Sequence, residues 1–166
     1  MRQGVWRAQC AQLLVGLAAL ALGAPALAGD AAGELSLDTR RGPVKLTPRH
    51  AYLLAGPSFD GKPMRQLVLS EAELTAAIQR CQRLGCVSGE LRSGVTVDLD
   101  GGPRLGYWFV ANDQRVQHSD TARADTMVLE QDSAERLRGR WTLPGGVGAS
   151  GTVRFDAALA KRFDKP

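Results

Sequence analysis

Cys81 and Cys86 are the first candidates for chemistry, because thiols at close spacing form disulfides, hold metals or carry redox reactions. They stand five positions apart in AAIQRCQRLGCVSG, and the chain has one other cysteine, Cys10. Catalytic thiol pairs usually have two residues between them and place the first at a helix N-terminus, which stabilises the thiolate. Here the preceding residues favour a helix that ends between Cys81 and Cys86, at Gly85, and the carbonyl end of a helix disfavours an anion. We therefore expect a structural disulfide.

The sequence gives little support for a metal or cofactor site. A zinc site needs about four nitrogen or sulfur ligands, and the two histidines, His50 and His118, have no paired spacing. Asp98 and Asp100 precede glycines as in a calcium loop, but Phe109 occupies the place of the glutamate that such a loop needs. We expect no metal, no cofactor, and a hairpin turn after Asp100.

Catalytic motifs are equally weak. The glycine-rich GGVGASGT at residues 145–152 lacks the lysine of a phosphate-binding loop, so we interpret it as a hairpin loop. It is also no nucleophile elbow, because Thr152 replaces the last glycine. No catalytic residue is predicted. A hydrolase assembled from distant residues, with His50 or His118 beside a serine and an aspartate, remains an open alternative.

The segment ERLRGRWTL places a row of arginines on one face of a predicted strand. Residues two apart share a face of a strand, so Arg136, Arg138 and Arg140 lie together, opposite apolar residues. If GTVRFDA pairs across the glycine loop, Arg154 joins the row. The planar guanidinium suits carboxylate and phosphate groups, so these four residues form the predicted binding surface for an anionic partner.

The alternative for this row is a solvated face without a ligand. Glu130, Asp132 or Asp156 could balance the arginines across neighbouring strands. Such exposed ion pairs contribute little to stability.

Trp108, in LGYWFVA, is the other candidate binding residue. Tyr107 and Phe109 point to one face of this strand and Trp108 and Val110 to the other, so both faces are apolar. We expect a second layer to cover the strand, and an exposed aromatic patch is the alternative.

Residues 1–28 have the pattern of a cleavable signal peptide. A basic start is followed by the short apolar run AQLLVGLAALALG and by the small-x-small site that ends at Ala28. The run is too short for a membrane span of roughly 20 residues, and Pro25 interrupts it. We expect a soluble periplasmic or secreted protein without a membrane span after cleavage. A disulfide is the default state of a cysteine pair in such compartments.

The remaining residues, 29–166, match one β-rich domain that is large enough to bury its own core. The whole chain has a net charge of +4, of which Arg2 and Arg7 in the signal segment supply two. The weak basic bias that is left gives no support for nucleic-acid binding, which needs a concentrated basic surface.

Most of the domain alternates with a period of two, as half-buried strands do. One helix is predicted at about residues 71–84, with Ser70 as N-cap, Glu73 completing a capping box and Gly85 ending it. We predict a mainly β fold, an antiparallel sandwich or partly open barrel of about eight or nine strands with that one helix. The strands are predicted in pairs: ELSLD with PVKLT, HAYLLA with MRQLVL, GVTVDLD with LGYWFVA, and LRGRWTL with GTVRFDA.

The order of these short motifs resembles small exported bacterial β-rich proteins of uncharacterised function. The resemblance covers most of residues 29–166. It implies a β-rich exported domain and carries no catalytic residue over. The motifs are an opening GELSLD, then HAY, a loop with F-D, LVLSEAEL between strand and helix, and a closing SGTVRFDAALA.

We therefore expect an exported, non-enzymatic binding domain that recognises an envelope or secreted protein or another anionic ligand. An inhibitor or immunity-like role is one concrete form. A hydrolase acting on an envelope polymer and a structural accessory domain are the alternatives. A hydrolase needs His50 or His118 in a cleft beside a carboxylate or serine, whereas a binding domain needs an exposed patch.

Overall fold

The computed structural model describes residues 28–145 and 148–166, so nearly all of the predicted signal segment lies outside the described residues. Ten strands form one sheet. Their bounds are β1 Gly29–Thr39, β2 Gly42–Leu46, β3 His50–Pro57, β4 Pro63–Ser70, β5 Gly94–Asp98, β6 Arg104–Ala111, β7 Val116–Arg123, β8 Met127–Asp132, β9 Arg136–Pro144 and β10 Ala149–Arg162.

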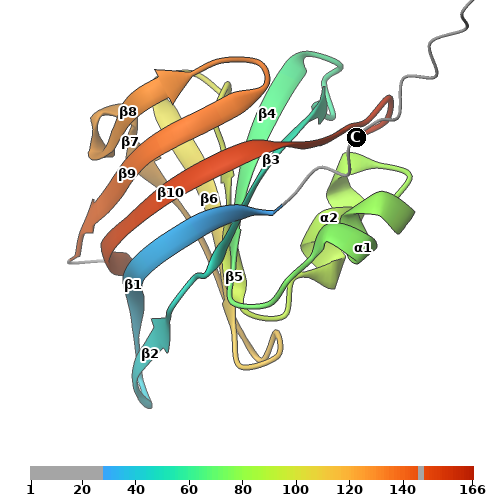
Figure 1. Cartoon of the computed structure of the whole chain (residues 1–166). Helices are drawn as coiled ribbons and strands as arrows, with labels where there is room; N and C mark the ends of the chain where they lie inside the picture. Colours follow the sequence, from blue (N-terminus) through green and yellow to red (C-terminus); the bar gives the residue numbers. More distant parts are fainter. Residues whose placement is uncertain (1–27, 146–147) are drawn as a thin grey trace, which may run out of the picture.

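The sheet curls into a half-barrel (Figure 1). Its strand order is β7-β6-β5-β4-β3-β1-β10-β9-β8, and β2 pairs with β1 beside this path. Neighbours run antiparallel, except that the end of β10 also runs parallel to β3. Strands β7 and β8 lie at opposite ends of this order, yet only a short 3-10 helix, Ala124–Thr126, connects them. The two edges of the curled sheet therefore meet at this corner. The predicted mainly β fold is confirmed.

The inner face of the half-barrel holds the larger core. Period-two alternation on nearly every strand supplies its residues, and opposite walls meet inside it: the rings of Tyr107 on β6 and Trp141 on β9 pack edge to face, 5.5 Å between centroids. Trp141 is fully buried, and its indole N–H donates to Thr126 Oγ1 at 3.2 Å. Trp141 thus fills the interior near β7 and β8, the two edge strands that do not pair with each other.

Two short helices, α1 Thr75–Arg80 and α2 Leu84–Glu90, cover part of the outer face of the sheet (Figure 1). The predicted apolar stripe of Leu74, Ile78 and Cys81 is buried there. Within the described part of the chain, no helix has the length and apolar character to cross a membrane. The buried residues of this second core are Tyr52, Leu54, Val68, Leu74, Ile78, Cys81, Leu84, Val87, Leu91, Val110 and Phe163.

The prediction of one helix over residues 71–84 is wrong at its start. Ser70 is still part of β4, where it is paired with both neighbouring strands and buried. Glu73 closes no capping box with it; its carboxylate accepts from the backbone N–H of Thr75 at 2.6 Å. The N–H of Leu74 donates to the hydroxyl of Tyr52 on β3 at 2.7 Å. Strand pairing and this long-range contact therefore delay the helix.

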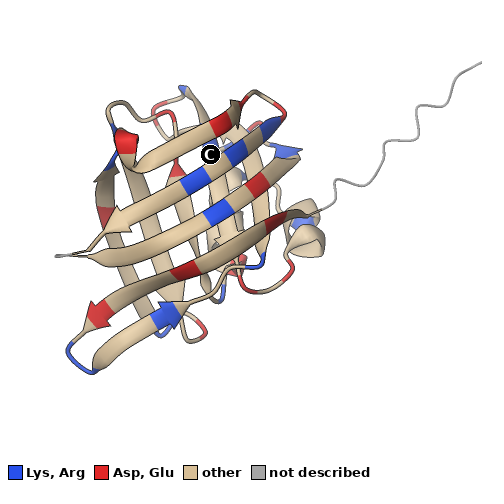
Figure 2. Ribbon diagram, turned by 60° about the vertical axis from the view of Figure 1, so that its left-hand side comes forward, with Lys and Arg blue, Asp and Glu red and all other residues tan. Residues whose placement is uncertain are grey.

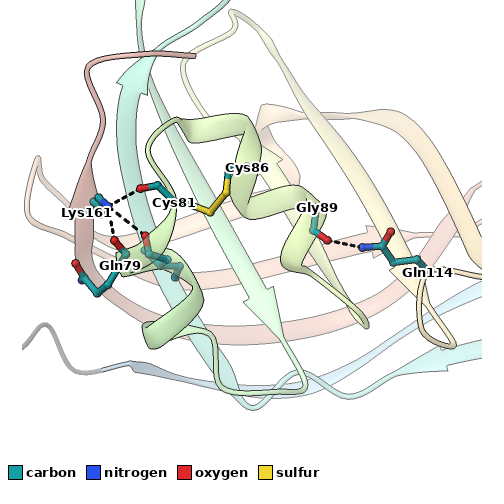
Figure 3. Close-up of a disulfide and its surroundings, with 7 residues drawn as sticks. Gln79, Cys81, Cys86, Gly89, Gln114 and Lys161 are labelled. Atoms are coloured by element: carbon teal, nitrogen blue, oxygen red, sulfur yellow. Dashed lines mark hydrogen bonds between the residues drawn. A yellow bond between two sulfur atoms is a disulfide. The ribbon is translucent and has the colours of Figure 1, made fainter.

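The helix also ends earlier than predicted, and a disulfide spans the break. The chain becomes extended at Cys81, and Gly85 lies inside α2 instead of ending α1. Cys81 and Cys86 form a disulfide, with their Cα atoms 5.6 Å apart. Lys161 of β10 donates to the carbonyls of Gln79 and Cys81 at 2.8 and 2.6 Å (Figure 3). These contacts satisfy carbonyl groups at the end of α1 that have no partner within the helix.

Arg65 connects two sides of the half-barrel that are far apart in strand order. It extends from β4, and its Nε and Nη2 donate to the carboxylate of Asp100 at 3.1 and 2.9 Å. Its Nη1 donates to Asp132, at the end of β8, at 2.5 Å. These bonds raise the pKa of Arg65 and hold the pKa of Asp100 below its usual range.

Candidate functional site

The arginine row is exposed on the outer face of the half-barrel. Arg136, Arg138 and Arg140 take alternate exposed positions on β9, and the positions between them are buried. Arg154 is exposed on β10, directly opposite Arg140. Figure 2 shows basic residues on adjacent strands of this face, with acidic residues among them. The structure thus brings the four predicted arginines onto one surface.

Two of the four arginines already have carboxylate partners. Arg136 donates through Nε and Nη2 to both oxygens of Asp156, at 2.6 and 2.7 Å. This pair, with its hydrogen bonds, lowers the pKa of Asp156. Arg138 Nε donates to Glu130 at 3.0 Å. Glu130 and Asp156 therefore take the balancing role that the sequence suggested for them.

Asp132, the third suggested counter-ion, lies elsewhere. A register shift between Leu129 and Gln131 places Asp132 opposite Leu137, whose side chain faces the core. Its carboxylate is on the other side of the sheet from the row and accepts from Arg65 instead. The suggestion that Asp132 balances the row is therefore wrong.

Arg140 and Arg154 form the unusual part of this surface. They face each other as direct partners on antiparallel strands. Within residues 28–145 and 148–166, neither guanidinium takes part in an ion pair. On the next pair toward the glycine loop, the hydroxyls of Thr142 and Thr152 lie 3.2 Å apart. The like charges of Arg140 and Arg154 thus lie side by side. The neutral hydroxyls of Thr142 and Thr152 are on one side of them, and the ion-paired Arg136 and Arg138 are on the other.

A shallow depression of about 330 Å³ adjoins this pair. Arg138 and Arg154 line it together with Asp30, Glu130 and Asp156. The depression therefore has mixed charge.

Trp108 is not part of an exposed patch. It lies on the helix-covered face of β6, is half-buried, and packs against the core beneath α1 and α2. Tyr107 and Phe109 face the inner core, as the alternation predicts. Trp108 is therefore covered by a second layer, as the sequence predicted, and does not join the arginines in one surface.

A hydrolase needs a histidine in a cleft beside a carboxylate or a serine, and the histidines of this protein meet this condition only in part. His118 and Asp120 share the inner face of β7, and His118 Nε2 lies 3.8 Å from Asp120 Oδ2, beyond hydrogen-bond distance. Tyr107 is nearby, with its ring centroid 6.3 Å from that of His118. No serine hydroxyl of the described residues bonds to His118. His50 is at the start of β3, opposite Ser70. The sequence did not reveal that Asp120 and Tyr107 adjoin His118.

Comparisons with protein-family models, curated proteins and solved structures each give no match. In the described parts of the chain, no group of three or more histidine, cysteine or acidic side chains is arranged to hold a metal ion. The exposed arginines and the His118–Asp120 neighbourhood are therefore the features that bear on function.

Proposed function

We propose that this protein is an exported binding domain that recognises an anionic group on an envelope or secreted partner through Arg140 and Arg154. The proposal rests on the direct pairing of these two arginines, neither of which forms an ion pair among the described residues. Like charges in directly opposed positions of a sheet destabilise it. An anion that binds both guanidinium groups removes this repulsion.

The chemistry of the pair favours a carboxylate or a phosphate group. Each guanidinium presents donors in a planar fork that pairs with two oxygens at once. Arg136 and Arg138 are less available, because Asp156 and Glu130 occupy them. An inhibitor or immunity-like protein, which binds an acidic surface of another protein, is one form of this function.

The test is a double substitution, Arg140→Gln with Arg154→Gln. Both side chains project from the face opposite the core, so the fold should persist. We expect weaker capture of partners from an envelope extract, and a smaller loss of binding when salt is raised, because exposed charges are screened over about 10 Å at 0.1 M salt.

A matched control replaces Arg40 and Arg41, two exposed arginines of the β1–β2 turn, by glutamine. This control removes the same charge from another surface and should leave capture unchanged. If the Arg140/Arg154 variant captures the same partners with the same salt response, the row is only a solvated face.

The hydrolase alternative has one specific observation in its favour, the proximity of His118 and Asp120. It predicts hydrolysis of an envelope polymer that His118→Gln abolishes while partner capture is retained. The structural accessory alternative predicts neither capture nor hydrolysis.

A further inference from the structure

A recess on the outer face of the sheet, beside α2, has the opposite charge to the arginine surface. We call it the Phe59 recess. It has a volume of about 420 Å³ and lies where the helical cover of β4 and β5 ends. Met64, Gln66 and Asp98 form its floor, Leu84 lies on the α2 side, and Phe59 of the β3–β4 hairpin stands at the rim.

The floor contains a buried amide oxygen without a donor. Gln66 and Asp98 are direct partners on β4 and β5, so their side chains share a face. Gln66 Nε2 donates to Asp98 Oδ1 at 2.8 Å, which fixes the orientation of the amide. Gln66 is only 8% exposed, and its Oε1 has no hydrogen-bond partner among the described residues. A buried acceptor without a hydrogen-bond partner is unfavourable, so a ligand that brings a donor to it gains affinity.

Asp98 adds a carboxylate without a cationic partner. Asp100, two residues further along the chain, is held by Arg65, whereas Asp98 has no ion pair within the described ranges. The residue opposite Asp98 on β6 is Gly106. A Cβ atom at Gly106 would come within 3.7 Å of Asp98 Oδ2, so glycine leaves room beside this oxygen.

The lining of the recess favours a cation. Among the residues that the structure describes, its charged side chains are Asp98 and Asp60, and no lysine or arginine side chain lines it. Asp60 is paired with Lys62, at 2.7 Å, which leaves Asp98 as the unpaired charge. The first N–H of α2, on Leu84, already donates to the carbonyl of Lys165, so this donor is not free for an anion.

Phe59 supplies the third feature of a cation site. Its side chain is 94% exposed, which is unusual for a large apolar residue. The face of an aromatic ring attracts an organic cation electrostatically. Met64 and Leu84 provide apolar contact for the carbon chain that carries the cation.

We infer that the Phe59 recess binds a primary ammonium group on an apolar stem. The ammonium donates to Asp98 and Gln66 Oε1, Phe59 covers it, and the stem packs on Met64 and Leu84. Two sources present this group: a free alkyl amine and the side chain of a lysine on a partner protein. This site is independent of the anionic partner proposed above, because it lies on other strands and selects the opposite charge.

The experiment is an NMR titration of the purified ¹⁵N-labelled protein with pentylamine at pH 7. Small ligands of this size bind weakly, so we expect saturable shifts of the Gln66 side-chain amide and of residues around Met64, with a dissociation constant in the millimolar range. Pentanol, which has the same stem without charge, should bind at least tenfold more weakly. Blocked lysine, with both backbone ends capped, separates the two sources: tighter binding than pentylamine favours a protein side chain.

Two substitutions test the named contacts. Asp98→Asn should weaken pentylamine binding at least tenfold, and Phe59→Leu should weaken it about twofold to fivefold. Asp113→Asn, on the exposed β6–β7 turn, is the matched control and should have no effect. Phe59 is exposed, so its variant keeps the fold even if Asp98→Asn does not. The inference is overturned if pentylamine gives no saturable shift, if pentanol binds equally well, or if both recess variants bind like the unmodified protein.

Discussion

The contact that most directly tests the half-barrel is the bridge made by Arg65, and the informative change is Arg65→Gln. The guanidinium side chain is only 25% exposed, and the Asp100 carboxylate that it binds is 33% exposed. Glutamine retains most of the stem but loses the charge and the hydrogen bonds to Asp100 and Asp132. The variant therefore removes the link between β4 and β8 and leaves two carboxylates uncompensated.

The magnitude follows from the geometry. Hydrogen bonds to charged groups contribute about 1.5–3 kcal/mol each, and partial exposure reduces this value. We expect the free energy of unfolding to fall by about 2 kcal/mol, which for a domain of this size lowers Tm by roughly 8 °C. Urea denaturation followed by circular dichroism measures the first quantity, and calorimetry measures the second.

The pH dependence gives a second, independent readout. The folded pKa of Asp100 is depressed by Arg65, so the bridge contributes fully above the unfolded pKa, about 3.8. Its contribution is lost as pH falls through the lower folded pKa. The difference between the unmodified protein and Arg65→Gln should therefore shrink below about pH 3.8.

Arg123→Gln is the matched control, because Arg123 pairs with Asp125 on a surface where the two side chains are 75% and 61% exposed. Arg123→Gln should leave the free energy of unfolding nearly unchanged, because exposed ion pairs are screened by solvent. The stabilising role of the Arg65 bridge is contradicted if Arg65→Gln lowers the free energy of unfolding no more than this control does, or if its effect persists unchanged at acidic pH.

Four further outcomes are expected. If residues 1–28 are a cleaved signal peptide, as we propose, mass spectrometry of the protein should find Gly29 at the N-terminus; an intact Met1 would contradict the proposal. Replacing Cys81 and Cys86 by alanine should lower the free energy of unfolding by about 2 kcal/mol in urea denaturation while partner capture persists; capture lost with the fold intact would refute a purely structural disulfide. Lys161→Met should speed amide hydrogen exchange in α1 more than in the sheet, because the end of α1 loses its donors; equal exchange would show that they do not stabilise the helix. Trp141→Ala should cost about 3–5 kcal/mol in the same denaturation assay, because the side chain is fully buried between opposite walls.

The sequence predicted the strands that carry several buried apolar residues, whether on one face or on both. All eight strands predicted in pairs are present, from the β1–β2 hairpin to the pairing of β9 with β10. Strands β7 and β8 were missed, because they lie at the edges of the sheet and have few buried residues. Edge strands need little apolar sequence, so alternation of polarity is weak in them.

Contacts between distant residues account for the errors in the helix. The hydroxyl of Tyr52 binds the backbone where α1 begins, and Lys161 binds it where α1 ends. Local signals at Ser70 and Gly85 could not reveal these partners, because β3 and β10 reach α1 only through the fold.

The candidate site was predictable where it depends on alternation along one strand. The exposure of Arg136, Arg138 and Arg140 follows from this alternation. Which arginines have counter-ions depends on the register of β8 and β10 against β9, including a register shift that the sequence does not signal. The pairing of Gln66 with Asp98 likewise requires the register of β4 and β5.

The position of β10 between β1 and β9 determines when the protein can fold. A growing chain emerges with β1 first, yet β1 pairs along most of its length with β10, the last strand in sequence. In the strand order, β1 and β10 connect the part of the sheet made by β3–β7 with the hairpin made by β8 and β9. Before β10 is available, β1 alone can make this connection, and its pairing with β3 covers only Gly29 and Asp30. Closing such a long loop is slow, because its entropic cost precedes the gain from pairing. The half-barrel therefore assembles in one late step, and a chain that stops before Ala149 leaves two partial sheets with open edges.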